Sequence, residues 1–235
     1  MGTVTTTKML QMETAGFGES MEERIFFTGP PSTRDPALTA RIEARKAAAA
    51  LMRTVAVRGY ETQAHCERVA TWSRRLAREM GLSPERVLDV ELGALLHDIG
   101  HIGVPNVDFE KSTALTPAER AELRKHCEIG ASLVHEIPSL RRALPLILSH
   151  HEEFDGTGYP SGAHGVAIPI DGRIFHLVDA FESMTSPRPY RLSRTDEAAR
   201  VEIANCTGTR FDPLVFAAFG RIDPSEWRAL VENVG

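Results

Sequence analysis

The chain has 235 residues, and its 27 Lys and Arg against 32 Asp and Glu leave a net charge of −5. Hydrophobic residues make up 42% and charged residues 25%, so a packed core is feasible and global disorder is not expected. The negative charge gives no broad attraction for DNA, RNA or an anionic membrane, and no run of 18 apolar residues predicts a membrane span.

The first 35 residues differ in character from the rest of the chain. Residues 1–35 are polar and interrupted by Gly and Pro, which predicts a tail or a loosely docked arm. From Pro36 onward the composition favours helices, and we expect one domain over residues 36–235. Its first helix is expected over residues 37–57, which are rich in Ala, Arg, Leu and Met and follow a proline suited to a helix start.

Helical spacing and capping residues predict the following helices in order. One covers residues 61–80, and the next begins at Ser83 and Pro84 and runs through Leu96. Thr116 to Glu119 reads as a capping box that opens a fourth helix toward Val134. A fifth runs from Pro138 to His150, an irregular loop covers 152–169, and helices follow at 171–184, 196–205, 213–219 and 225–231. No strand pattern or internal repeat is evident, so the predicted fold class is all-α.

The cysteines and the N-terminus favour a reducing compartment. Cys66, Cys127 and Cys206 are too few for a disulfide scaffold and form no CxxC pair. The N-terminal residues MGTVTTTKML lack the layout of a secretory signal. A cytoplasmic location is therefore expected.

Most of the nine histidines lie between His65 and His151, and the chemistry is sought there. Glu61 and His65 are four residues apart on one predicted helix, so their side chains share a face. The other histidines and acidic residues of interest come from separate predicted segments: His97 and Asp98 at the end of an apolar helix, His126 in the middle of the fourth helix, His150 and His151 at the end of the fifth, and Asp179 within the sixth.

These residue types suit a metal centre. Burying a carboxylate such as Asp98 or Asp179 among apolar residues is costly unless the carboxylate is paired or bound to a metal. Imidazole and carboxylate are suited to iron, manganese or zinc. Two such metals can deprotonate a water and hold the attacking and leaving oxygens of a phosphoryl displacement. Each motif alone also fits a polar helix end or an exposed pair, so the specificity comes from the ordered set.

That ordered set resembles the HD-GYP subfamily of the HD-domain metal phosphohydrolases over roughly residues 40–225. The resemblance is carried by HDIGHIGVPN at 97–106, HCEIG at 126–130, HHEEFDGTGYP at 150–160, RIFHLVDAFESMTSPRPYR at 173–191 and GTRFDPLVFAAF at 208–219. It implies an all-α bundle of helices around a bi- or trinuclear metal site, with an irregular GYP loop. It also implies hydrolysis of the bacterial second messenger cyclic di-GMP to linear pGpG, GMP or both, in the bacterial cytoplasm.

The resemblance implies a ligand set, position by position. The positions that match family metal ligands are His65, His97, Asp98, His126, His150, His151 and Asp179. Asp98 would bridge two metals, and Glu61 matches a ligand of those members that hold a third. The implied cofactors are thus two or three divalent ions, with iron and manganese as the family's usual metals.

Substrate contacts are expected from two further segments. Gly158 allows a close backbone approach, and Tyr159 with Pro160 gives a rigid apolar surface beside the metals; alone, however, these are ordinary turn residues. Arg188 and Arg191 match basic residues that contact the substrate phosphates in the family, and the alternative is a solvated basic turn.

His101 departs from the family pattern HDxGK, in which a lysine stands at this position. Histidine titrates near neutrality, so its charge depends on pH and surroundings. His101 can donate a hydrogen bond to a phosphate, protonate the leaving group or join the metal shell. With Asp98 it is the candidate for a catalytic role. Glu152 is a candidate partner for a ligand imidazole, and Trp72 and Trp227 are expected in the core.

Three alternatives for function and regulation remain open from the sequence. The substrate could be a mixed cyclic GMP–AMP, since no residue clearly reads the base edges. The chain could instead be a weakly active or inactive domain that serves as a cyclic dinucleotide receptor or a protein-interaction module, for which the His101 substitution is the only support. A homodimer through the helix at 37–57, a separate sensory partner, or ordinary bundle packing of that helix are further possibilities.

Overall fold

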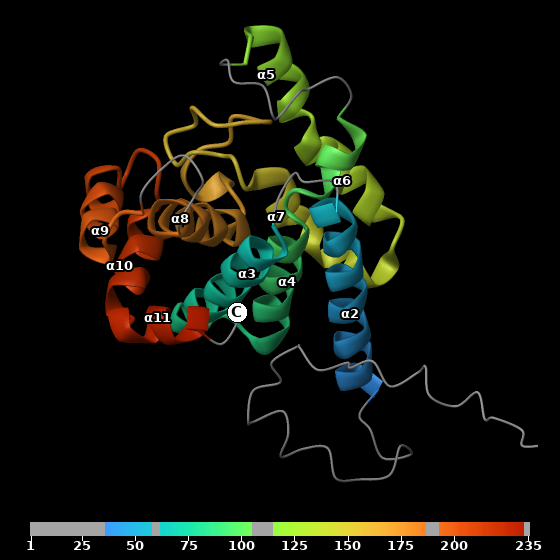
Figure 1. The fold of residues 1–235 in the computed structure, drawn as a ribbon, viewed down its shortest axis with the longest axis horizontal. Helices are drawn as coiled ribbons and strands as arrows, with labels where there is room; N and C mark the ends of the chain where they lie inside the picture. Colours follow the sequence, from blue (N-terminus) through green and yellow to red (C-terminus); the bar gives the residue numbers. More distant parts are fainter. Residues whose placement is uncertain (1–35, 58–61, 105–114, 187–192, 233–235) are drawn as a thin grey trace, which may run out of the picture. The chain divides into compact units, whose positions relative to one another are not determined.

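The computed structural model describes residues 36–57, 62–104, 115–186 and 193–232 (Figure 1). The predicted arm, Glu61, Arg188 and Arg191 lie outside these ranges, so the expectations for them remain predictions. The described residues form helices, and among them the only β-type pairing is an isolated bridge between Thr207 and Phe211. The all-α fold class is therefore confirmed.

The helices of the described ranges follow one another closely along the chain. They are α2 (Pro36–Val57), α3 (Gln63–Glu79), α4 (Pro84–Leu96), the 3₁₀ helix η2 (Ile99–Gly103), α5 (Pro117–Arg124), α6 (His126–His135), the 3₁₀ helix η3 (Pro138–Ala143), α7 (Leu144–Ser149), the 3₁₀ helix η4 (Gly165–Ala167), α8 (Ile170–Thr185), α9 (Asp196–Asn205), α10 (Pro213–Arg221) and α11 (Pro224–Glu232). None of these helices is both long enough and apolar enough to cross a lipid bilayer.

The helix starts are set by the side chains that the sequence suggested. The Ser83 hydroxyl accepts a hydrogen bond from the Arg86 amide at the start of α4. At the start of α5, Thr116 and Glu119 each accept from the backbone amide of the other, which completes the predicted capping box. These contacts satisfy amides that no preceding turn can reach.

Two predicted helices are each divided in the structure. The fourth ends at Arg124 and restarts at His126, because the Lys125 amide bonds to the Glu122 carbonyl three residues earlier, which tightens the turn. His126 is therefore the first residue of α6, and the expectation that it lies in the middle of a helix is wrong. The fifth begins as a 3₁₀ helix and becomes α7 only at Leu144, because Pro145 has no amide to continue an α-helix from Arg141.

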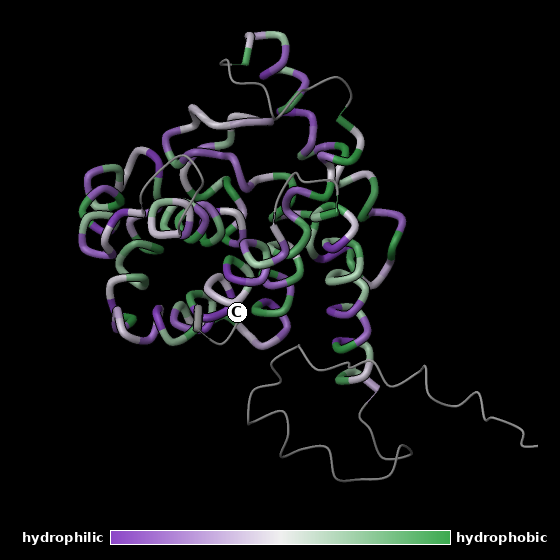
Figure 2. The backbone as a smooth tube through the Cα atoms, in the orientation of Figure 1, coloured by the Kyte–Doolittle hydropathy of each residue, from purple (hydrophilic) through white to green (hydrophobic). Residues whose placement is uncertain are grey.

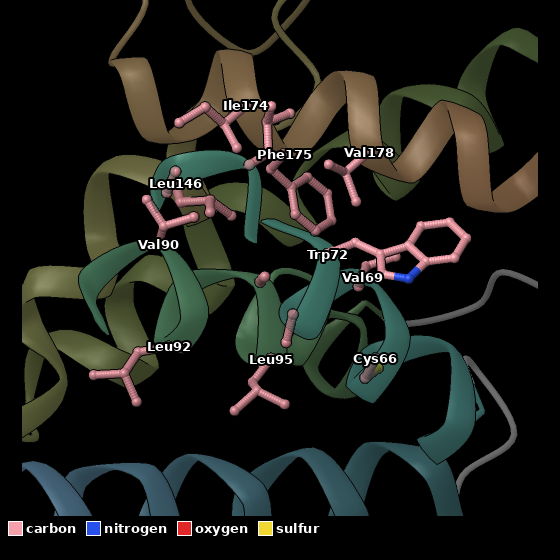
Figure 3. Close-up of a cluster of buried hydrophobic side chains, with 14 of the residues drawn as sticks. Cys66, Val69, Trp72, Val90, Leu92, Leu95, Leu146, Ile174, Phe175 and Val178 are labelled. Atoms are coloured by element: carbon pink, nitrogen blue, oxygen red, sulfur yellow. The ribbon is translucent and has the colours of Figure 1, made fainter. Parts of the chain in front are cut away.

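The core lies among α3, α4, α7 and α8 (Figure 3). Trp72 from α3 packs against Phe181 of α8 and Trp227 of α11, with ring centroids 5.3 and 5.2 Å apart. Both tryptophans are almost fully buried, as predicted. This aromatic cluster fixes α8 against α3, and these two helices contribute Asp179 and His65 to the site described below.

Helix α2 packs against α4 as an ordinary member of the bundle. Hydrophobic and hydrophilic positions alternate along it (Figure 2), and Ala44, Ala48, Met52 and Val55 are buried. The bundle-packing alternative for the helix predicted at 37–57 therefore accounts for its apolar face. A homodimer or a sensory partner remains a prediction.

Candidate metal centre

Side chains from three separate helix ends converge on one carboxylate. Asp98 follows α4, His126 opens α6, and His150 and His151 follow α7. One ligand atom from each of these residues lies within 4.8 Å of those from the others. His126 and His150 are almost fully buried, whereas Asp98 and His151 keep partial exposure. The cluster is thus held by rigid elements and remains open on one side.

The ring orientations of three histidines follow from hydrogen bonds to the main chain. Nδ1 of His97 lies 2.9 Å from the Ala94 carbonyl, Nδ1 of His126 lies 2.7 Å from the Leu123 carbonyl, and Nδ1 of His150 lies 2.8 Å from the Ile147 carbonyl. A carbonyl accepts only, so each Nδ1 carries the proton and donates. The Nε2 of each ring is then the nitrogen that can bind a metal, once it carries no proton.

The two oxygens of Asp98 face different imidazoles. Oδ2 lies 3.3 Å from Nε2 of His97, while Oδ1 lies 3.3 Å from Nε2 of His101, 3.4 Å from that of His126 and 3.7 Å from that of His150. A carboxylate with a separate nitrogen set at each oxygen has the arrangement needed to bridge two cations.

The shortest contact between imidazoles fits a cation-binding site. Nε2 of His126 lies 3.0 Å from Nε2 of His150. Both rings are engaged through Nδ1, so a proton on one Nε2 or a bound cation accounts for this distance. The neighbouring Asp98 carboxylate adds a hard oxygen donor. These nitrogen and oxygen donors fit iron, manganese or zinc.

A second group of side chains adjoins His97. The ring of His65 lies 5.7 Å from that of His97, and His65 Nε2 lies 3.5 Å from Asp179 Oδ1. The other nitrogen of His65, Nδ1, donates to Glu182 Oε2 at 2.8 Å. Together with the Asp98 cluster, this group brings all the described residues of the predicted ligand set into one region.

Glu182 was missed by the sequence reasoning, although its signal is present. It lies one turn after Asp179 on α8, within the same apolar stretch, and is 1% exposed. Its carboxylate also accepts from the Arg68 guanidinium, at 2.8 Å for Nε, and from the Ser186 hydroxyl at 2.7 Å. Glu182 therefore orients His65 in the way that main-chain carbonyls orient the other histidines.

The electrostatics of the cluster keep two of its imidazoles neutral and favour a charge on a third. Burial and the neighbouring His150 lower the pKa of His126 to about 3, and burial with the same neighbour strongly lowers the pKa of His151. Burial also opposes charge on His97, but the Asp98 and Asp179 carboxylates outweigh it and raise the pKa of His97 to about 9. Although burial favours the neutral acid, the surrounding histidines hold the pKa of Asp98 well below its usual range. The carboxylate thus attracts a positive charge to this place.

The GYP loop closes one side of the cluster. The Tyr159 amide bonds to the His151 carbonyl at 3.1 Å, and the phenol ring stacks on the His151 imidazole with centroids 4.6 Å apart. A Cβ on Gly158 would lie 2.3 Å from the Glu153 nitrogen, so only glycine allows this close return of the chain. The structure therefore places Gly158 and Tyr159 beside His151.

Glu152, which was expected to orient a ligand imidazole, contacts the GYP loop instead. Glu152 Oε1 accepts from the amide and hydroxyl of Ser161, at 2.8 and 2.7 Å, and so fastens the GYP loop. The imidazoles of His97, His126 and His150 are oriented by main-chain carbonyls.

His101 is buried and stacks on His126 with ring centroids 4.2 Å apart, within the cluster itself. Cys127 is a buried core residue, and burial raises the pKa of its thiol to about 12.

Comparison with known proteins gives consistent matches. The model of the HD domain family matches residues 44–215. A cyclic di-GMP phosphodiesterase of Thermotoga maritima is 39% identical over 168 residues, covering 71% of this chain and 46% of that protein. A 3′3′-cGAMP-specific phosphodiesterase of Vibrio cholerae is 35% identical over 167 residues, covering 69% of this chain and 32% of that protein. The chain thus spans less than half the length of these relatives.

Solved structures share the fold. An HD-GYP-type protein from Bdellovibrio bacteriovorus superposes with a TM-score of 0.55 at 21% identity, covering 76% of this chain and 61% of that one. A cyclic GMP–AMP-specific phosphodiesterase from Vibrio cholerae gives a TM-score of 0.58 at 22% identity, covering 74% of this chain and 47% of that one. At these identities the likeness concerns the arrangement of helices.

Proposed function

The chain belongs to the HD domain family, in its HD-GYP branch, and on this premise we propose that it is a metal-dependent phosphodiesterase that hydrolyses cyclic di-GMP. The observation that carries the proposal is the convergence of imidazole Nε2 atoms on both oxygens of Asp98. The similarity to cyclic dinucleotide phosphodiesterases supports the substrate class, with linear pGpG, GMP or both as product.

The residues present fit two divalent ions, iron or manganese, and Asp98 would help to hold both. The other proposed ligands are His65, His97, His126, His150, His151 and Asp179, and Glu61, which lies outside the described residues, would serve a third ion. Bound divalent ions lower the pKa of water and neutralise charge on phosphoryl oxygens.

The protein's own side chains would hold the nucleotide and supply protons. Tyr159 stacks on His151 and, with Pro160 next to it in the chain, is proposed as the rigid edge on which a flat nucleotide rests. Arg188 and Arg191 are proposed phosphate contacts. His101 is proposed as the proton donor to the leaving ribose oxygen or as a hydrogen-bond donor to the phosphate. Because its Nε2 also lies 3.3 Å from Asp98, metal content in a His101→Ala variant separates these roles from metal binding.

A mixed cyclic GMP–AMP is the second candidate substrate. A relative named for that specificity is 35% identical, close to the 39% of the cyclic di-GMP enzyme. Parallel turnover of both cyclic dinucleotides decides between them. The complete set of described ligand positions favours an enzyme over a receptor, and a cytoplasmic location fits the proposed substrate.

The proposal is tested on protein purified without oxygen. Metal analysis and product chromatography with added Mn²⁺ or Fe²⁺ are expected to show bound metal and conversion of cyclic di-GMP to a linear product. His150→Ala removes an imidazole nitrogen from the cluster and should lower both metal content and turnover. Stoichiometric metal with no turnover of any cyclic dinucleotide would favour the receptor, and protein without metal affinity would refute the proposal.

A further inference from the structure

An exposed cation lies at the edge of the metal-ligand cluster, and the sequence reasoning did not identify it. Arg124 is the last residue of α5, the helix that projects beside the start of α6 (Figure 1). Its guanidinium carbon lies 4.7 Å from the centroid of the Tyr159 ring. The same ring stacks on His151. Arg124 and His151 therefore share the Tyr159 ring as a contact at the edge of the cluster.

The guanidinium of Arg124 has no carboxylate partner among the described residues. By contrast, the next residue, Lys125, is an exposed cation whose Nζ pairs with Glu122 at 2.6 Å. A guanidinium that rests with its carbon over an aromatic ring is restrained in position and still presents N–H groups at its edges. Those groups match the geometry of a phosphate and can bind two of its oxygens at once.

The position of Arg124 distinguishes it from the proposed metal ligands. Arg124 and His151 each lie against the Tyr159 ring, and the centroid of that ring is 6.5 Å from the His126 ring. Arg124 thus adjoins the cluster through this ring and is not one of the proposed metal ligands. We therefore consider a ligand with two phosphates, one beside the imidazole nitrogens around Asp98 and the other at Arg124. A cyclic dinucleotide carries two phosphodiesters in one ring and so meets this requirement.

We propose that Arg124 binds the phosphodiester of the cyclic dinucleotide that is not being cleaved, an inference that rests on the proposed function. Arg124 is then a substrate-binding residue that sets specificity for substrates with two phosphates. It holds the substrate equally before and during the reaction, so its loss should act on KM and leave kcat nearly unchanged.

Two substrates separate this role from a structural one. For cyclic di-GMP, Arg124→Ala should raise KM by roughly 10-fold to 100-fold, the range expected for loss of a charge-assisted hydrogen bond, with kcat nearly unchanged. For bis(p-nitrophenyl) phosphate, which has a single phosphodiester, kcat/KM should stay within about twofold. Arg124→Lys keeps the charge without the planar fork and should recover part of the loss. Lys125→Ala is the matched control, because it removes a neighbouring positive charge that does not lie on Tyr159.

Several kinetic results would refute the proposed role of Arg124. An equal loss on both substrates, or a fall in kcat, would show that Arg124 only supports the GYP loop, and the proposal would be wrong. An unchanged KM for cyclic di-GMP, or an equal rise in Lys125→Ala, would also overturn it. If the unmodified protein neither binds nor hydrolyses a cyclic dinucleotide, the proposed function itself is wrong, and the assignment of Arg124 fails with it.

Discussion

The buried Glu182 carboxylate offers a sharp test of how the site is held together. Glu182 accepts from His65 Nδ1 and from Arg68 Nε, both at 2.8 Å, and it is 1% exposed. Burial alone would raise its pKa, but the hydrogen bond and charge of His65, with Ser186 and Arg68, lower the pKa from 4.5 to about 2. Because one pKa unit corresponds to about 1.4 kcal/mol, the ionised carboxylate stabilises the folded state by about 3 kcal/mol at neutral pH.

Glu182→Gln keeps the shape of the side chain and removes its charge. We expect the free energy of unfolding, measured in urea at pH 7 without added metal, to fall by about 3 kcal/mol. The contribution of a carboxylate with a lowered pKa is present above the unfolded value of about 4.5 and is lost as the pH falls toward the folded value of about 2. The difference between the two proteins should therefore shrink by roughly 1 kcal/mol between pH 7 and pH 4.

A matched control is Glu202→Gln, which makes the same chemical change in an exposed ion pair with Arg194 at 3.2 Å. Exposed pairs contribute about 0–1 kcal/mol, so this variant should differ little from the unmodified protein. The reasoning would be refuted if Glu182→Gln were as stable as Glu202→Gln. It would also be refuted if the loss at Glu182 did not depend on pH.

Further predictions concern the loop, the core and the unusual histidine. Gly158→Ala places a Cβ 2.3 Å from the Glu153 nitrogen and should lower turnover by about 100-fold through displacement of the loop, whereas Gly220→Ala, with nothing within 4 Å, should leave turnover unchanged. Trp227→Ala removes a ring that is 1% exposed and should cost about 3–5 kcal/mol in urea unfolding; a loss below about 1 kcal/mol would contradict the packing described for it. His101→Lys replaces an imidazole by a fixed positive charge and should change the pH profile of turnover, while an unchanged profile would make His101 a bystander.

The helices could be predicted from local signals, but some of the breaks within them could not. The cap at Thr116 and the proline at position 84 act on their own turns, so the sequence pattern contained them. The break at Lys125 keeps a helical backbone conformation on both sides and disturbs no periodicity. Nor could local patterns show that Gly100 lies against α6, where an added Cβ would meet the His126 carbonyl at 1.9 Å.

The side chains that the structure brings together at Asp98 could be predicted because the family motifs contain them, but the groups that orient them could not. The carbonyls of Ala94, Leu123 and Ile147 belong to the main chain and leave no mark on the sequence. Glu182 could have been found by the argument applied to Asp179, an acidic residue among apolar ones. Arg124 could not have been found in this way, because its proposed role depends on contact with the Tyr159 ring, which a distant loop contributes.

The most direct test of the account is an anomalous-diffraction map of crystals of the protein loaded with Mn²⁺. We expect two strong peaks at Asp98, one beside each carboxylate oxygen. The peak beside Oδ1 should lie near His126 and His150, and the peak beside Oδ2 should lie near His97. A map with no peak within bonding distance of Asp98 would contradict the central claim that these side chains form a metal centre.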